Sequence, residues 1–172
     1  ENRIVKPTVD GLVKDNLPYK GFIFIGLIVV ENEPMVIEYN VRMGDPETEV
    51  VLPRLKTDLL EIFQAIDNEC LNEIEIEIDP QTAVTVMLVS GGYPEAYVKE
   101  KEITGLENVK ESIVFHAGAT KADGKLVTNG GRVLTVTSLG DDFRSALESS
   151  YKSIENIKFE AMNYRTDIGF DL

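Results

Sequence analysis

The sequence predicts an α+β fold in two parts. An antiparallel hairpin followed by a helix comes first, and a small strand-rich unit closed by a second helix follows. Short apolar runs bounded by turn residues recur along most of the chain, which is typical of strands. Helical spacing of apolar residues dominates in two stretches, residues 57–67 and 143–154. The composition, 43% hydrophobic and 27% charged, is that of a folded globular protein.

The first part is predicted to open with a loop and a hairpin. Residues 1–20 are polar and contain two prolines and a glycine, so we expect an extended or looped segment. Residues 22–30 are rich in Ile, Val and Phe, which indicates a buried strand. A turn-like stretch over residues 31–34 follows, and residues 35–41 then predict the second strand of an antiparallel pair.

A change of period marks the end of the first part. After a short helical turn near residue 50, apolar spacing predicts a helix over residues 57–67, with Asp58 as its N-terminal cap. Isoleucines then alternate with glutamates over residues 74–78, which indicates a half-buried strand with an acidic face. We place the domain boundary here, with a first domain over 1–68 and a second over 79–172.

The second part is predicted to be mostly strands. Turn signals at Asp123-Gly124 and Asn129-Gly130 lie between the later strands. Asp141 and Asp142 are cap candidates for the closing helix, whose apolar residues end at Ile154. The expected strands cover residues 83–89, 109–116 and 132–138.

The amino-acid composition argues against several classes of function. Lys and Arg number 17 against 30 Asp and Glu, a net charge of −13, which argues against nucleic acid or an anionic membrane as a partner. The longest apolar run is far shorter than the ~20 residues of a membrane span. One cysteine, Cys70, and one histidine, His116, exclude an internal disulfide and a Cys/His zinc site. We expect a cytoplasmic protein.

The second strand of the hairpin carries the most informative polar pattern. Side chains alternate along a strand, so Glu38, Asn40 and Arg42 are expected on one face, with successive side chains about 7 Å apart. A carboxylate and an amide oxygen suit a hard divalent cation such as Mg²⁺, and an arginine can hold a phosphoryl oxygen. The pattern therefore suits nucleotide phosphates. Taken alone, so short a motif is better explained as a solvated strand face with a surface ion pair, because patterns of this length recur by chance.

Resemblance over the whole chain favours the first interpretation. The sequence resembles the phosphoribosylamine–glycine ligases (glycinamide ribonucleotide synthetases), a family of ATP-grasp enzymes. The similarity is carried, in the family's order, by Pro18-Tyr19-x-Gly21-Phe22, Glu38-Tyr39-Asn40-Val41-Arg42-Met43-Gly44-Asp45-Pro46-Glu47-Thr48-Glu49, Ser90-Gly91-Gly92-Tyr93-Pro94, Val127-Thr128-Asn129-Gly130-Gly131-Arg132-Val133-Leu134 and Tyr164-Arg165-Thr166-Asp167-Ile168-Gly169.

The resemblance implies a reaction and roles for residues. ATP phosphorylates the carboxylate of glycine, and the amine of 5-phosphoribosylamine attacks the acyl phosphate to give glycinamide ribonucleotide, ADP and phosphate. By position, Glu38 and Asn40 match ligands of Mg²⁺ or Mn²⁺, and Arg42 matches a catalytic, phosphate-facing arginine. Asp45 and Glu47 are candidates for binding the ammonium group of glycine or the amine of the ribosylamine, because carboxylates suit amines.

The same resemblance indicates what this chain does not contain. It matches the last part of an ATP-grasp core and the C-terminal domain, so the N-terminal and ATP-clamping domains are expected before Glu1, and the chain alone is expected to be inactive. Gly26 stands where the wider superfamily often has another acidic metal ligand. The alternatives are another ATP-grasp carboxylate–amine ligase, or a noncatalytic binding domain of this fold.

Other motifs carry weaker predictions. Residues 91–94 read as a tight turn after a strand, and His116 as a hydrogen-bonded structural histidine. Gly130-Gly131-Arg132 either forms a hairpin turn or places a cation near a phosphate. Cys70 is expected to be an incidental helix-end residue.

Overall fold

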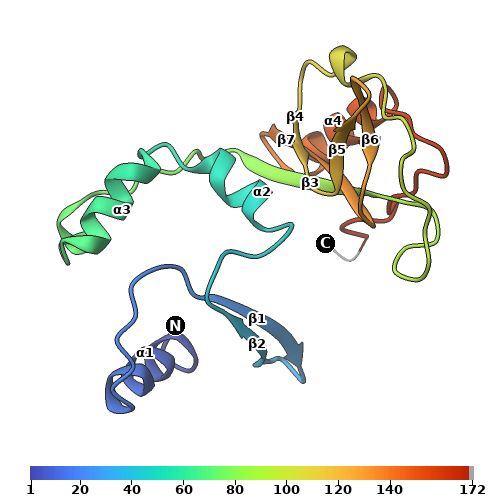
Figure 1. The fold of residues 1–172 in the computed structure, drawn as a ribbon. Coiled ribbons are helices and arrows are strands. Elements are labelled where there is room, and N and C mark those ends of the chain that lie inside the picture. The colour runs from blue at the N-terminus through green and yellow to red at the C-terminus, as the bar shows by residue number, and fades with distance from the viewer. Residues whose placement is uncertain (171–172) are drawn as a thin grey trace. The chain divides into compact units, whose positions relative to one another are not determined.

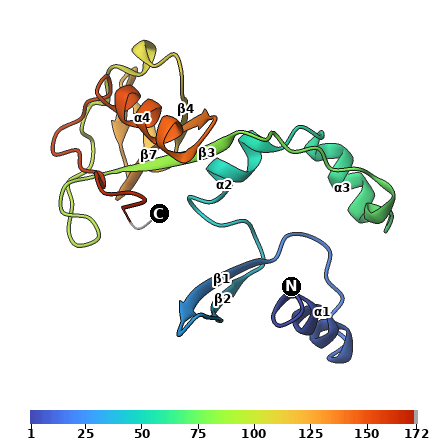
Figure 2. The same cartoon turned by 180° about the vertical axis from the view of Figure 1, so that it is seen from behind.

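The computed structural model describes residues 1–170 and divides the chain into two compact units (Figures 1 and 2). The first unit comprises residues 1–45 and 55–77, and the second comprises residues 46–54 together with the chain from residue 78 onward. We describe each unit by itself. Mixed helices and antiparallel sheets confirm the predicted α+β class.

The first unit begins with a helix where a loop was expected. Helix α1 (Val5–Lys14) contains Pro7, which the sequence analysis treated as a sign of irregular backbone. The proline lies in the first turn, where backbone N–H groups have no intrahelical acceptor, so it costs no hydrogen bond. The first such bond is made by the next residue, whose N donates to O of Ile4 over 3.0 Å.

The predicted hairpin is present, but it is not buried. Strand β1 (Phe24–Val30) pairs antiparallel with β2 (Glu33–Asn40), and the loop residues Glu31 and Asn32 both have positive φ, as a type I′ turn requires. The prediction of a buried strand was wrong, because Val29 is 70% exposed, and on the paired strand Ile37 is 64% exposed. Most residues of this two-stranded sheet are therefore exposed among residues 1–170.

The helix predicted over residues 57–67 is confirmed as α3 (Leu59–Asp67). Asp58 caps it by accepting a hydrogen bond from the backbone N of Leu60 over 2.8 Å. Phe22 meets the helix through an edge-to-face ring contact with Phe63, at 6.1 Å between centroids. A 3₁₀ turn, η2 (Leu71–Glu73), follows.

The half-buried strand predicted over residues 74–78 is not formed. Ile76 is 42% exposed, and no strand is assigned to this segment. Its backbone instead hydrogen-bonds to the segment that precedes α3: the N of Lys56 donates to O of Glu77, and the N of Glu77 donates to Oγ1 of Thr57. Alternation of isoleucine and glutamate therefore marks an extended segment without a sheet.

The second unit is built on a three-stranded antiparallel sheet of order β3-β7-β4. The strands confirm the predictions, although β4 is shorter than the expected residues 109–116. The elements are α2 (Thr48–Val51), η1 (Leu52–Arg54), β3 (Thr82–Val89), η3 (Leu106–Asn108), β4 (Ile113–His116), β5 (Ala119–Ala122), β6 (Lys125–Thr128), β7 (Arg132–Gly140) and α4 (Phe143–Ile154). Strands β5 and β6 form a separate hairpin turned by Asp123-Gly124.

The core of the second unit lies between this sheet and α4, which covers one of its faces in both views (Figures 1 and 2). Val86 of β3, Val136 of β7 and Ile154 of α4 are fully buried. Asp142 caps α4, accepting a hydrogen bond from the N of Ser145 over 2.8 Å. The closing helix is thus held by both apolar packing and its cap, as the sequence predicted.

Candidate functional site

Glu38 and Asn40 lie together at the end of β2. Nδ2 of Asn40 donates a hydrogen bond to Oε1 of Glu38 over 3.0 Å, so the two side chains share one face of the strand. Glu38 is exposed and Asn40 is half-buried. The structure therefore brings these two predicted residues together in a position that solvent reaches.

Gly26 faces this pair from the neighbouring strand. It is the register partner of Glu38, and a Cβ atom added to it would lie 3.0 Å from Cγ of Glu38. That is closer than nearly all real contacts of this kind. The absence of a side chain at Gly26 lets the carboxylate of Glu38 pass over β1.

Arg42 is not part of the strand. Strand β2 ends at Asn40, so strand alternation does not extend to Arg42, and its place on the same face as Glu38 and Asn40 stays a prediction. Arg42 is exposed, and its Nη1 donates to the backbone O of Met43 over 3.0 Å.

The two carboxylates predicted to bind an amine belong to different units. Asp45 is the last residue of this stretch of the first unit and is exposed. Glu47 is also exposed and directly precedes α2 in the second unit, where its backbone O accepts from the N of Val51 over 3.0 Å.

The donors at the end of β2 fit a hard divalent cation. Carboxylate and amide oxygens are what Mg²⁺ and Mn²⁺ take, and Mg²⁺ in particular is often held by one or two carboxylates while phosphates and water complete the shell. Within residues 1–170 no three His, Cys, Asp or Glu side chains are grouped for metal binding. Glu38 and Asn40 would therefore hold such an ion as a pair.

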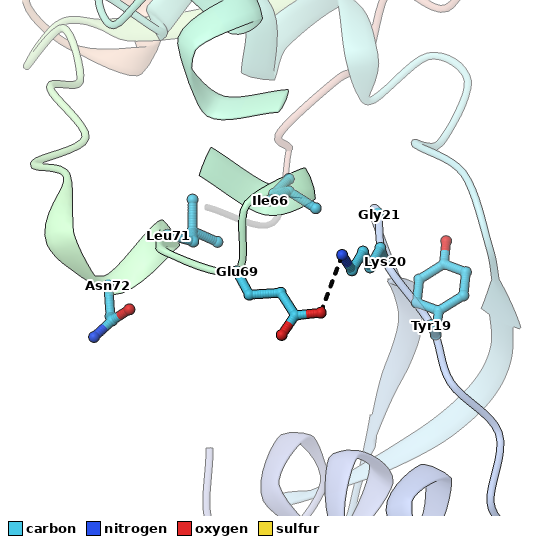
Figure 3. Close-up of a pocket in the computed structure, with 7 residues that line it drawn as sticks. All are labelled: Tyr19, Lys20, Gly21, Ile66, Glu69, Leu71 and Asn72. Carbon is cyan, nitrogen blue, oxygen red and sulfur yellow. Dashed lines mark ion pairs between the residues drawn. The ribbon is translucent and has the colours of Figure 1, made fainter. Parts of the chain in front are cut away.

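A cavity of about 740 Å³ lies in the first unit (Figure 3). Lys20 crosses it, with Nζ 3.1 Å from Oε1 of Glu69 and donating to the backbone O of Asp67 over 2.7 Å. None of the predicted site residues lines it. The ion pair joins the segment before β1 to the end of α3, which is a structural role.

A second cavity, of about 430 Å³, lies within the second unit. Two of its segments, the turn at residues 91–94 and Arg132, were candidates from the sequence, whereas the segment after α4 was not. The full lining is Pro46, Met87, Val89, Tyr93, Pro94, Arg132, Asn163, Tyr164 and Arg165. The sequence feature that could have identified the segment after α4 is the block at residues 164–169, which carries part of the family resemblance.

The remaining candidates have structural positions. Residues 91–94 form the predicted turn, closed by the N of Tyr93 donating to O of Ser90 over 3.1 Å. His116 ends β4 and is exposed, and Cys70 follows α3 as predicted. No helix within residues 1–170 has the length and apolar character needed to cross a membrane.

Comparison with known proteins identifies the family. Residues 83–171 match the family described as "Phosphoribosylglycinamide synthetase, C domain", and residues 1–48 match "Phosphoribosylglycinamide synthetase, ATP-grasp (A) domain". The first match covers more than half of the chain.

Individual relatives agree with this assignment. A phosphoribosylamine–glycine ligase of Caldanaerobacter subterraneus subsp. tengcongensis is 47% identical over 168 residues, which cover 98% of this chain and 40% of the relative. The trifunctional purine biosynthetic protein adenosine-3 of Gallus gallus is 46% identical over 97% of this chain and 17% of its own length. This chain thus spans well under half of these relatives.

Solved structures lead to the same conclusion. The crystal structure of a phosphoribosylamine–glycine ligase from Thermotoga maritima matches with a TM-score of 0.79 at 37% identity, covering 93% of this chain and 40% of that one. An N5-carboxyaminoimidazole ribonucleotide synthetase from the same organism, at 18% identity and a TM-score of 0.57, shares the fold alone. This chain belongs to the phosphoribosylglycinamide synthetase family, and it carries part of the ATP-grasp domain and the C domain.

Proposed function

We propose that this chain carries part of the active site of an ATP-dependent ligase that joins glycine to 5-phosphoribosylamine. The reaction passes through a glycyl phosphate and yields glycinamide ribonucleotide, ADP and phosphate. The observation that carries the proposal is the 47% identity over 98% of the chain to a protein named for these two substrates.

The end of β2 is where we propose the metal site. Glu38 and Asn40 supply oxygen ligands for Mg²⁺ or Mn²⁺, and their position on one solvent-reached face supports this role. A metal ion there would offset the negative charge of the transferring phosphoryl group. Arg42, two residues beyond, would add a guanidinium that can hold a phosphoryl oxygen.

The amine-binding role of Asp45 and Glu47 also remains a proposal. Both carboxylates are exposed, so an amine can reach them from solvent. In the proposed reaction they hold either the ammonium group of glycine, which positions its carboxylate for phosphorylation, or the amine of the ribosylamine, which positions that amine to attack the glycyl phosphate.

The proposal extends to the rest of the polypeptide. We propose that residues 1–68 end the ATP-grasp domain, that residues 79–172 form the C-terminal domain, and that the ATP-clamping segments belong to the same polypeptide. Residues 1–172 alone are then inactive. A cytoplasmic location also stays a prediction, suggested by the biosynthetic names of the relatives.

A chimeric enzyme tests the function directly. Residues 1–172 would replace the matching 40% of the Caldanaerobacter ligase, and ADP release would be measured with glycine and freshly prepared 5-phosphoribosylamine. We expect turnover that requires both substrates, and none from residues 1–172 alone. A folded chimera that still binds ATP but forms no glycinamide ribonucleotide would contradict the proposal and favour a noncatalytic domain, while turnover with a different carboxylate or amine would favour another ligase of this class.

A further inference from the structure

The cavity of the second unit is unusual for so acidic a chain. Asp and Glu are 30 of the 172 residues, yet among residues 1–170 none of them lines this cavity, whereas two of the chain's six arginines, Arg132 and Arg165, do. Asn163 adds an amide, and Tyr93 and Tyr164 add aromatic rings with hydroxyl groups. The cavity is therefore locally cationic on a protein with a net charge of −13.

Backbone hydrogen bonds hold the walls of the cavity together, although its segments are distant in sequence. Val89 and Asn163 exchange two bonds, of 2.8 and 3.0 Å, which tie the end of β3 to the segment after α4. The N of Ser90 donates to O of Gly131 over 2.8 Å, and Oγ of Ser90 donates to O of Gly130 over 2.8 Å. These bonds fix the positions from which both arginines project.

Arg165 is held by its own contacts. Its Nε and Nη2 donate to the two carboxylate oxygens of Asp167, each over 2.8 Å, and Tyr151 donates its hydroxyl to the backbone O of Arg165 over 2.9 Å. The hydrogen bonds from the guanidinium lower the pKa of Asp167, so this carboxylate stays ionised and holds the guanidinium of Arg165 in place. Asp167 also offsets part of the local positive charge, which leaves Arg132 an essential part of any anion site.

One wall of the cavity is aromatic and close to Arg132. A Cβ atom added to Gly131 would lie only 2.1 Å from the ring of Tyr93, so this ring packs directly on the backbone of Gly131. Met87, Val89 and Pro94 contribute apolar surface beside it. A site with guanidinium groups and an apolar, aromatic wall suits a small ligand with an anionic end and a less polar ring.

We propose that this cavity binds the phosphate of a sugar phosphate monoester, with Arg132 and Arg165 contacting the phosphate and Tyr93 packing against the sugar. A phosphate monoester carries close to two negative charges at neutral pH, and paired arginines match its oxygens better than they match a single carboxylate. This inference rests on the proposed function in one respect, because phosphoribosylamine, named in the relatives, is such a monoester.

Binding to residues 1–172 tests the site without requiring turnover. Backbone amide NMR shifts would be followed during titration with ribose 5-phosphate, and separately with ribose, inorganic phosphate, ATP and glycine. We expect ribose 5-phosphate to shift the amides of residues 89–94, 130–132 and 163–165, and ribose and glycine to have no effect. Saturable shifts there with glycine or ATP but not with ribose 5-phosphate would overturn the proposal.

Substitutions distinguish direct contacts of Arg132 and Arg165 with the phosphate from a general effect of positive charge. Arg132→Ala should weaken binding of ribose 5-phosphate roughly 10- to 100-fold, the loss expected for hydrogen bonds to a charged group. Arg144→Ala removes the same charge from the exposed side of α4, outside the cavity lining, and should change nothing. Arg165→Lys keeps the charge beside Asp167 and should weaken binding while the spectrum stays folded. Equal affinities for all three variants would refute the assignment.

The chimeric ligase distinguishes failure of this inference from failure of the proposed function. There, Arg132→Ala should raise the KM for phosphoribosylamine about 10-fold or more and leave the KM values for ATP and glycine unchanged. If the chimera is active and its KM for phosphoribosylamine does not change on this substitution, the cavity has no role in the reaction. The other case is an inactive chimera, with isolated residues 1–172 still binding ribose 5-phosphate through Arg132. That result would contradict the proposed reaction and leave the phosphate site standing.

Discussion

Asn40 donates a hydrogen bond from Nδ2 to Oε1 of Glu38 over 3.0 Å, from two residues further along β2. In this arrangement the amide nitrogen faces the carboxylate, so the amide oxygen is the atom left to approach a cation. An amide can turn about its terminal torsion at little cost. Glu38 and Asn40 therefore form a pair in which the carboxylate both orients the amide and supplies the charge.

Neutralising Glu38 should impair metal binding and turnover together. Glu38→Gln removes the only charged ligand of the proposed pair, and we expect a roughly 10²-fold lower turnover of the chimeric ligase, because the metal ion offsets phosphoryl charge. Binding of Mn²⁺ to residues 1–172, followed by electron paramagnetic resonance, should weaken in parallel.

Glu31→Gln is the matched control for this prediction. It removes the same charge from the turn of the same hairpin, where Glu31 is exposed. Both measurements should stay at the level of the unaltered chain. Full activity of the Glu38→Gln enzyme would contradict the metal assignment.

A buried hydroxyl in the core of the second unit predicts a stabilising substitution. Thr135 is fully buried on β7, and its Oγ1 has no hydrogen-bond partner among residues 1–170. Thr135→Val keeps the shape and removes the polar atom, so the free energy of unfolding should rise by about 1 kcal/mol. Chemical denaturation of residues 1–172 measures it.

The neighbouring threonine on the same strand provides the opposite case. Oγ1 of Thr137 donates to Oγ1 of Thr85 over 2.8 Å, so Thr137→Val breaks a bond and should lower the free energy of unfolding by about 1 kcal/mol. Effects of the same sign for the two valine variants would show that hydrogen bonding does not decide stability here.

Acid should weaken the cap of α4. The hydrogen bond from the backbone N of Ser145 lowers the pKa of Asp142 from its usual 3.8, because it favours the ionised carboxylate. A folded-state pKa below the unfolded one contributes stability above pH ~3.8 that is lost as the pH falls through the folded value. Asp142→Asn retains a capping oxygen, so it should keep α4 but flatten this part of the pH dependence. Unfolding curves between pH 5 and 2 that are identical for both proteins would exclude this contribution.

Sequence patterns correctly predicted the elements whose apolar residues are buried within their own unit. Strand β7 and helix α4 bury residues such as Val136 and Ile154 against each other, so their apolar periods describe their real surroundings. The helix at Val5–Lys14 was missed because Pro7 was read as a breaker without regard to its place in a first turn. Residues 74–78 were misassigned because alternation alone does not provide a partner strand.

The candidate site was likewise predicted in part from the sequence. Alternation along a strand placed Glu38 and Asn40 on one face, which the structure reproduces, but it cannot say where a strand ends, and Arg42 lies beyond that end. The cavity of the second unit was only partly foreseen. Its arginines come from β7 and from the segment after α4, and backbone pairing of Val89 with Asn163, which no local pattern reveals, brings them together.

Hydrogen exchange should rank the sheets by burial. Amides of β3 and β7 pair across fully buried residues such as Val86 and Val136, so they should exchange only on global unfolding of the second unit. The hairpin of β1 and β2 has two strands and exposes Val29 and Ile37 on its faces, so it should exchange fastest among the strands of residues 1–170.

The hairpin of β5 and β6 provides a comparison, because it is more buried than the hairpin of β1 and β2 and is paired with a further backbone segment. It also has two strands, but Val127 and Thr128 of β6 are buried, and the N of Ile103 donates to O of Leu126 over 2.8 Å. If burial controls exchange, its amides should be protected well beyond those of β1 and β2 when exchange is followed by NMR at neutral pH. Equal exchange in the two hairpins would mean that neither burial nor the added pairing of β6 controls exchange, and that the exposed apolar faces of β1 and β2 do not weaken them.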